Sequence, residues 1–312
     1  PLFSLYGAVL GGKESRAPMT QENLQRQEKT AISRSDSSNL GGLSSPSILI
    51  AESFSKFKPF GKELNDEPHA VINDGNLAEL SGIAPARGLN EYWGHNDKGN
   101  DPEIYRFNLQ GEILQKVVLK GAKNNDWEAI ERDENGNLII GAFGDNDEKR
   151  EEYCLYQFPE PHNKVKKIDR YKIFRFVYSN SQSHNCEAFF LCDRKIYLVT
   201  KEKKKKDNPI LFCIPRLDEN ALNVAEEIGR LDISGKVTDA AFSATHQILA
   251  IMTSSGIAFY QVQTTDKFFL NPVRFVETDF DQCEGLCLDG DHLVASNESG
   301  EIWKYSLDSF LR

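Results

Sequence analysis

The sequence has no long hydrophobic run, and this absence excludes a membrane-spanning helix. Such a span needs about 20 consecutive apolar residues, whereas the longest apolar stretches, such as 137–143, have the length of a strand. The chain also lacks an excess of positive charge, since 37 Lys and Arg stand against 47 Asp and Glu for a net charge of −10. Because an acidic protein repels phosphate backbones and anionic lipid, we expect no nucleic-acid partner and a tolerance for bound cations.

Cysteine is scarce, and several familiar motifs are missing. The six cysteines form no Cys-x-x-Cys pair, which excludes a zinc ribbon and a disulfide-rich mini-domain. All six lie in strand-like segments, where a small buried thiol packs well, so we predict that they are reduced. No glycine-rich phosphate loop, nucleophile elbow or Ser-His-Asp order is present. No long segment has the 3.6-residue period of an amphipathic helix.

One short motif is present five times, and the rest of the chain lies between its copies. Each copy is a carboxylate followed by a small or apolar run, and the acids are Glu79, Glu128, Glu187, Asp239 and Glu284. Successive acids are 45 to 59 residues apart, a period typical of repeat architectures. After each motif come further segments with the alternating pattern of strands, separated by turn residues. The sequence therefore predicts an array of four-stranded β units.

The last unit lacks one strand, and this indicates how the array closes. Residues 283–307 supply three strands, and the strand-like residues between 46 and 64 can supply the fourth, which would close a ring and remove its exposed edges. We therefore predict an all-β, five-bladed β-propeller over residues 46–312. A six-bladed ring, with 46–69 as a degenerate blade, and an open β-solenoid are the alternatives.

The first 45 residues differ in composition from the rest. Residues 12–45 are rich in Ser, Gln, Asn, Arg and Lys, with few aromatics, so we expect a mobile tail over 1–45. Residues 1–12 fit either the end of a signal peptide or an ordinary apolar start. The protein is expected to be periplasmic or secreted in the first case, with the cytoplasm as the alternative.

The five acids predict a metal site. In a propeller the first strand of each blade lies nearest the axis, so these acids would surround one axial opening. Carboxylates crowded together raise each other's pKa and favour a compensating cation. An oxygen-only ligand set suits a hard cation, with Ca²⁺ favoured over Mg²⁺. The alternative is that the acids accept hydrogen bonds from backbone N–H groups of the neighbouring blade and bind no metal.

The ends of the second strands predict a polar rim around that opening. Its members are His95, Asn96, Asp97, Asp145, Asn146, Lys201, Glu202, Ser254, Ser255, Asn297 and Glu298. We expect a ligand to be bound by Asn96, Asp145, Asn146, Arg150, Lys201 and Asn297. If the protein is an enzyme, Asp97 or Glu128 would be the base and His95 a proton carrier or a group facing developing negative charge.

The motifs resemble those of a known family. The order Glu-Leu-Ser-Gly, Trp-Glu-Ala-Ile, Cys-Glu-Ala-Phe, Thr-Asp-Ala-Ala and Cys-Glu-Gly-Leu is similar to that of the SdiA-regulated family of bacterial periplasmic propellers. This resemblance, over about 79–307, implies five blades around a central calcium. The layout is more distantly similar to soluble calcium-activated nucleotidases. Asp239 stands where those enzymes tend to have Ser, and their phosphate-binding residues have no match here.

Two functions follow from these patterns. The first is a calcium-binding propeller, expected to be a monomer, that binds a small or anionic ligand or a partner at its acid-lined axial face. The second is a calcium-dependent hydrolase of phosphate esters, nucleotides or lactones. The absence of a recognisable nucleophile and base pair favours binding.

Overall fold

The computed structural model describes residues 67–202, 207–233, 235–262 and 272–311, and strands dominate them. Local sequence explains many strand boundaries. Between β6 and β7, for example, the Asp133 side chain accepts hydrogen bonds from the backbone N–H groups of Asn135 and Asn137, at 2.9 and 2.8 Å. Gly136 takes the left-handed φ of 75° that the turn requires. The predicted boundary between residues 45 and 46 lies outside the described residues.

The strands form five antiparallel groups of four. The first contains β2 (Leu80–Pro85), β3 (Glu91–Asn96), β4 (Glu103–Asn108) and β5 (Ile113–Leu119). The second contains β6 (Ala129–Arg132), β7 (Asn137–Ala142), β8 (Tyr153–Pro159) and β10 (Lys172–Tyr178). The third contains β11 (Cys186–Cys192), β12 (Lys195–Thr200), β13 (Ile210–Ile214) and β14 (Asn223–Arg230).

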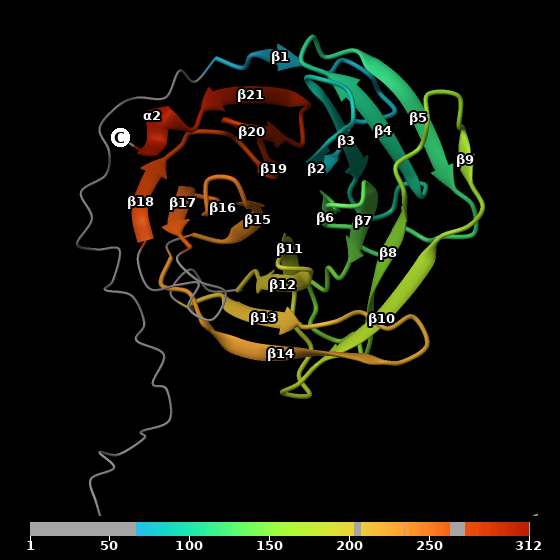
Figure 1. Cartoon of the computed structure of the whole chain (residues 1–312), viewed down its shortest axis with the longest axis vertical. Helices are drawn as coiled ribbons and strands as arrows, with labels where there is room; N and C mark the ends of the chain where they lie inside the picture. Colours follow the sequence, from blue (N-terminus) through green and yellow to red (C-terminus); the bar gives the residue numbers. More distant parts are fainter. Residues whose placement is uncertain (1–66, 203–206, 234, 263–271, 312) are drawn as a thin grey trace, which may run out of the picture. The chain divides into compact units, whose positions relative to one another are not determined.

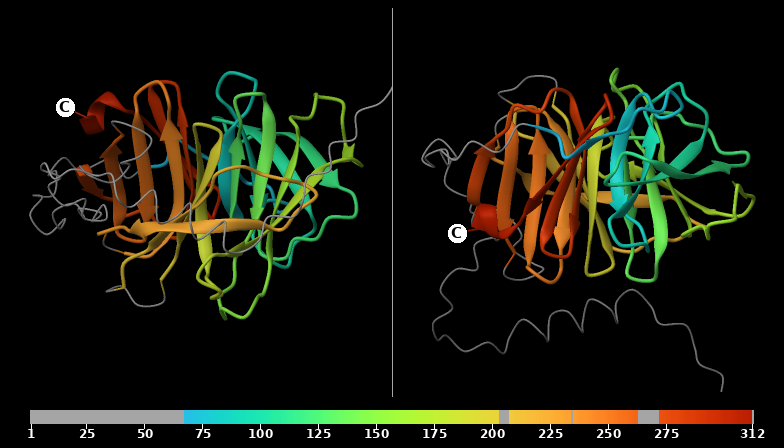
Figure 2. Two further views of the ribbon diagram at one scale, coloured as in Figure 1. Left: turned by 60° about the horizontal axis from the view of Figure 1, so that its bottom comes forward. Right: turned by 90° about the horizontal axis from the view of Figure 1, so that it is seen from above.

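The remaining two groups complete the described fold. The fourth contains β15 (Val237–Ser243), β16 (Ile248–Thr253), β17 (Gly256–Gln261) and β18 (Pro272–Glu277). The fifth contains β19 (Cys283–Asp289), β20 (His292–Asn297), β21 (Glu301–Ser306) and β1 (Ala70–Val71), and the short helix α2 (Asp308–Leu311) follows it. Figure 1 shows the groups arranged around a central axis, and Figure 2 shows them from the side.

The inner strands form a closed ring. Each first strand lies beside the next in the order β2, β6, β11, β15, β19 and back to β2 (Figure 1). The prediction of an all-β propeller is thereby confirmed. Hydrogen bonding joins the strands into four sheets rather than five, because the parallel pairing of β10 with β14 merges the second and third groups into one eight-stranded sheet. In addition β9 (Lys167–Ile168), from the second group's last connection, pairs with β5 of the first.

An N-terminal strand completes the fifth group, as predicted, but its position corrects the prediction. Ala70 and Val71 of β1 pair antiparallel with Ile302 and Glu301 of β21. The segment 46–64, which we expected to fill this role, lies outside the described residues. The strand-forming signal at 70–71 is only two residues long, so composition did not distinguish it. Closure therefore depends on residues immediately before the first acid motif.

We predict that removal of β1 destabilises the ring. A chain starting at Asp74 should melt well below one starting at Glu67, because it loses the pairing with β21 and the buried Ile72 side chain, which is 4% exposed. Ile72→Ala alone should lower the unfolding free energy by about 2–4 kcal/mol. Val71→Ala is the control, because the neighbouring Val71 side chain is 37% exposed. This substitution should change the unfolding free energy by less than about 0.5 kcal/mol. Equal denaturant midpoints for the two single variants would contradict this.

The hydrophobic core is divided among the contacts between neighbouring groups. Trp93 of the first group packs in one cluster with Trp127 and Tyr156 of the second. Phe143 meets Phe189 edge to face in the cluster between the second and third groups. Three further clusters join the remaining neighbours around the ring. All six cysteines lie in the described part of the chain and none is paired, which confirms the prediction of free thiols.

Candidate functional site

One recurring backbone hydrogen bond defines the register of the five groups. In each group, a residue one or two positions after the second strand donates its N–H to the carbonyl of a residue one to three positions before the first strand. The pairs, from donor to acceptor, are Asp97 to Glu79, Gly144 to Asp126, Lys201 to Asn185, Ser254 to Lys236 and Glu298 to Gln282. Glu79 is therefore equivalent to Asp126, and not to Glu128.

This register corrects the expectation of five acids at equivalent positions. Two residues beyond those acceptors the chain has Ser81, Glu128, Glu187, Thr238 and Glu284. Only Glu128, Glu187 and Glu284 are thus in register, while Glu79 lies two positions earlier and Asp239 one position later. The sequence motif could not reveal this, because its small and apolar residues match equally well in shifted frames. Bulges in the inner strands of four groups add to the shift.

Asp239 is used to hold neighbouring inner strands together. Its Oδ1 accepts the N–H of Ala240 at 2.8 Å, and its Oδ2 accepts the N–H of Leu286 in β19 at 2.6 Å. The carboxylate is buried, at 3% exposure. This is the arrangement expected of a carboxylate that ties adjacent blades without a metal. Glu79, by contrast, is exposed, and its Oε2 accepts a hydrogen bond from Asn100 Nδ2 at 2.6 Å.

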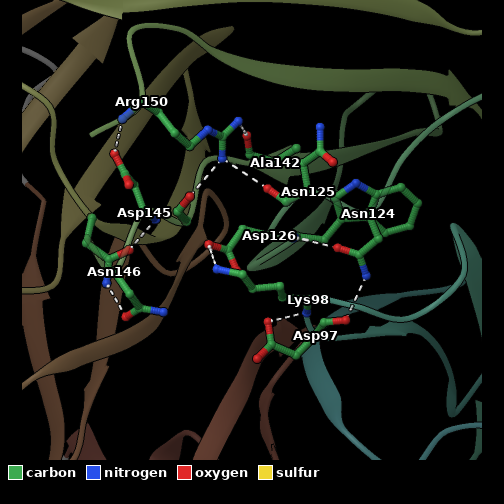
Figure 3. Close-up of polar contacts among 12 residues, drawn as sticks. Asp97, Lys98, Asn124, Asn125, Asp126, Ala142, Asp145, Asn146 and Arg150 are labelled. Atoms are coloured by element: carbon green, nitrogen blue, oxygen red, sulfur yellow. Dashed lines mark hydrogen bonds and ion pairs between the residues drawn. The ribbon is translucent and has the colours of Figure 1, made fainter. Parts of the chain in front are cut away.

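Three other carboxylates converge at the axial end of the first and second groups. Asp97 follows β3, and Asp126 and Glu128 precede β6; each offers one oxygen, and these oxygens lie within 4.8 Å of one another. Asp126 is nearly enclosed, with a side chain 4% exposed. Its Oδ2 accepts a hydrogen bond from Lys98 Nζ at 2.9 Å, and its Oδ1 is buried with no partner among the described residues (Figure 3). We call Asp97, Asp126 and Glu128 the acid cluster.

The local fold fixes the acid cluster from both sides. Asn124 Nδ2 donates to the carbonyls of Asn96 and Asp97, and its Oδ1 accepts the N–H of Trp127, so one side chain joins the two loops (Figure 3). Asp126 has a φ of 81°, a left-handed conformation that costs a non-glycine residue free energy and occurs often at functional sites. The pairing of β5 with β9 also ties these two groups together at their outer edges.

Gly144 leaves the space that the acid cluster occupies. A Cβ at this position would overlap Glu128 Oε1 and lie 2.7 Å from Asp126 Cγ. No side chain larger than hydrogen therefore fits while both carboxylates keep their places. Gly144 is the second group's equivalent of Asp97.

The charges around the axis favour cation binding. Burial, and next the charge of Glu187, raise the pKa of Glu128 well above its usual value. Burial raises the pKa of Asp97, and Asp126 adds to this effect. Burial also raises the pKa of Glu284 to about 8. Such shifts mean that each carboxylate is more costly to ionise here than in water, and a bound cation would reverse that cost.

Most of the predicted ligand-binding residues are already hydrogen-bonded within the protein. Asp145 Oδ2 accepts the N–H groups of Lys149 and Arg150, each at 2.8 Å, and the Tyr153 hydroxyl. The Arg150 guanidinium donates to three backbone carbonyls, including Gly144 O at 2.7 Å, and lies over the Tyr153 ring (Figure 3). These two residues build the loop that follows β7, and their predicted ligand contacts stay predictions.

The remaining predicted ligand-binding residues also have partners within the protein. Asn96 Oδ1 accepts the N–H of Glu79, and its Nδ2 donates to Asn76 O. The Asn297 side chain is bonded to Glu301. Lys201 Nζ lies 3.1 Å from Glu187 Oε2. Asn146 is exposed, and its Oδ1 accepts a 3.2 Å hydrogen bond from Asn185.

His95 is enclosed rather than on the rim. Its side chain is fully buried, its Nδ1 lies 3.1 Å from Asn96 O, and its ring meets that of Trp127 edge to face. Burial lowers its pKa to about 4. The imidazole is therefore uncharged at neutral pH. Its predicted role as a proton carrier stays a prediction, and the buried ring does not face solvent.

Sequence reasoning missed Asp126, Lys98 and Gly144. Asp126 was visible in the sequence as an acid two residues before Glu128, but the search for one acid per repeat left it out. Its importance follows from the backbone register and from its unpartnered oxygen, which sequence spacing does not report.

Comparisons with known proteins give no family assignment. No family model matches the chain, and no curated protein matches it. A solved structure of PQQ-bound aldose sugar dehydrogenase from Streptomyces coelicolor is similar, with 11% identity, a TM-score of 0.47, and coverage of 78% of this chain and 96% of that one. A gluconolactonase from Xanthomonas campestris has 12% identity, a TM-score of 0.43, and coverage of 77% and 84%. A structure of a nidogen/laminin complex has 10% identity, a TM-score of 0.44, and coverage of 74% and 76%.

These comparisons assign neither a ligand nor a metal to this protein. The resemblance to SdiA-regulated propellers has no counterpart among the family models. Among the described residues no helix has the length and apolar character needed to cross a membrane.

Proposed function

We propose that this protein binds one divalent cation, calcium, through the acid cluster, and that the ion makes the axial face a binding site for a small anionic ligand. The observation that carries the proposal is the buried and unpartnered Asp126 Oδ1 beside two further carboxylates. A buried acceptor without a partner costs about 1–3 kcal/mol, and more when it is charged. A cation bonded to this oxygen would offset that cost.

The chemistry of the cluster supports calcium among divalent ions. Its three residues offer oxygen only, and carboxylates that bind through one oxygen or two suit the variable coordination number of calcium. Mg²⁺ would require near-ideal octahedral geometry, and a site with mixed loop carboxylates does not impose it. We expect a dissociation constant of about 10⁻⁴ to 10⁻³ M, as in extracellular calcium modules.

The ligand is expected to be anionic because the cation and a lysine would meet it together. Asp97 is half-buried and Lys98 exposed, so the cluster opens to solvent on this side. The ion would attract an anionic group, and Lys98 Nζ, released from Asp126, would pair with it. Asn125, an exposed amide that directly precedes Asp126, could add a hydrogen bond. Without the ion, the surrounding carboxylates would repel the same ligand.

The hydrolase alternative has less support. In the proposed site Asp97 and Glu128 would hold the cation rather than act as a free base, and His95 is buried. Phosphate esters, nucleoside diphosphates and lactones assayed with calcium and with chelator would distinguish the two functions. Calcium-dependent turnover lost in Glu128→Gln would favour the enzyme. Ligand-induced stabilisation without turnover, weakened in Lys98→Met, would favour binding.

We predict that Gly144→Ala weakens calcium binding at least tenfold while the protein stays folded. The new methyl group would displace the Glu128 and Asp126 carboxylates from the cluster. Calorimetric titration with CaCl₂ should show at least a tenfold weaker affinity than wild type, the effect of moving one charged ligand. Gly75→Ala, where a Cβ meets nothing within 4 Å, is the control and should bind as wild type. Unchanged affinity in Gly144→Ala would place the ion elsewhere.

A further inference from the structure

The ammonium of Lys201 pairs with Glu187, one of the three glutamates that are in register, and interacts electrostatically with the other two, Glu284 and Glu128. The backbone bond from Lys201 N to Asn185 O makes this residue the third group's equivalent of Asp97. At the position where the first group offers a carboxylate to the acid cluster, the third group therefore offers a positive charge. The side chain is largely enclosed, at 22% exposure, and Nζ lies 3.1 Å from Glu187 Oε2.

The glutamate next to Lys201 is fully committed to partners within the protein. Glu187 Oε1 accepts Asn185 Nδ2 at 2.8 Å, Oε2 faces the ammonium, and the Glu128 carboxyl also hydrogen-bonds Glu187. Burial lowers the pKa of Lys201, but the charges of Glu187 and Glu284 more than reverse this, so the amine is charged. The glutamates of the axis thus already have a cation.

Lys98 provides the contrast. It pairs with Asp126 at 2.9 Å, but its side chain is 57% exposed and Asp126 keeps one oxygen without a partner. An exposed lysine can leave its carboxylate for solvent at little cost. Lys201 is enclosed and its carboxylate has no free oxygen, so an ion cannot displace it in the same way.

We infer that Lys201 is a tethered cation that neutralises Glu187 and Glu284, and so restricts calcium to the acid cluster. The inference rests on the proposed function in one respect, which is that the wild-type protein binds one calcium ion at the acid cluster. Replacing the amine by an uncharged side chain of similar length should open a second site formed by Glu187 and Glu284, while Glu128 stays in the acid cluster.

The test is calorimetric titration with CaCl₂ of wild type and Lys201→Met, each checked for folding by thermal melting in the presence of calcium. We expect one ion per chain in the wild type and two in Lys201→Met. Lys201→Arg keeps the positive charge and should bind one. Lys98→Met removes the exposed lysine and should also bind one, with about tenfold tighter affinity because a competing charge is lost.

A double variant guards against misfolding caused by an uncompensated charge. Lys201→Met with Glu187→Gln removes both charges of the pair, so it should fold and bind one ion. Equal numbers of ions in wild type and Lys201→Met would overturn the inference, as would a second ion in Lys201→Arg. If the wild type binds none, the proposed function fails, while a gain from none to one in Lys201→Met would still support the role of Lys201.

Discussion

Calcium at a hundredfold excess over its dissociation constant should raise the melting temperature of this protein by about 5–10 °C, and Asp126→Asn should remove the increase. Binding only to the folded state at that excess adds about 2.7 kcal/mol of stability. In a domain of this size each kcal/mol shifts the melting temperature by about 2–4 °C. Asp126 is decisive because it contributes the buried oxygen that has no other partner among the described residues.

The calcium-free state separates this effect from simple damage to the fold. In chelator, Asp126→Asn should melt no lower than wild type, because the substitution keeps the shape of the side chain and relieves repulsion from Asp97 and Glu128. Asp147→Asn is the matched control, since it removes a 76% exposed charge from the next loop. It should keep the full calcium response. A calcium response retained by Asp126→Asn, or absent from the wild type, would contradict the acid cluster as a metal site.

Gly82→Ala should destabilise the protein by about 3 kcal/mol, well beyond the effect of a glycine replacement in an open turn. Gly82 has a φ of 69°, and a Cβ there would lie 2.8 Å from Ala129 Cα and 3.0 Å from Ile130 N, both in the next inner strand. The left-handed conformation costs a residue with a Cβ about 1–2 kcal/mol. Overpacking against backbone that cannot move aside adds about 1–3 kcal/mol.

Gly290→Ala is the control that isolates the overpacking. Gly290 has a similar φ of 57°, but a Cβ there meets nothing within 4 Å. It should therefore show only the conformational cost of about 1–2 kcal/mol. Urea unfolding in the presence of chelator would compare the two variants without a contribution from bound metal. Equal losses of unfolding free energy would mean that β2 and β6 do not need their close approach.

The strands could be predicted because their signals are local. β7, with Leu138, Ile139 and Ile140 between turn residues, and β20, before Asn297 and Glu298, were recognisable from alternation, apolar runs and turns. β14 is an outer strand, at the place where the order of segments within the third unit predicts an outer strand or loop. β1 was misplaced because a two-residue strand has almost no signal of its own.

The acid cluster could be predicted only in part. Asp97 and Glu128 were singled out by their positions after a second strand and before a first strand. Asp126 was passed over, and Glu79 and Asp239 were placed with the in-register acids, because similarity between short motifs does not determine which backbone groups pair. The bond from Gly144 N to Asp126 O supplies that information.

By itself the sequence determined the all-β class, the repeat of inner strands that each contain or directly follow an acid, the unpaired cysteines and the excess of negative charge. These properties depend on composition and on patterns within a few residues, and contacts with neighbouring blades do not change them. Only the tertiary structure decided that Asp239 would bond to β19, that Lys201 would lie beside Glu187, and that Asp126 would be buried with one oxygen unpartnered. Each of these depends on contacts between residues more than 13 positions apart, and a bulge of a single residue is enough to change which side chains meet.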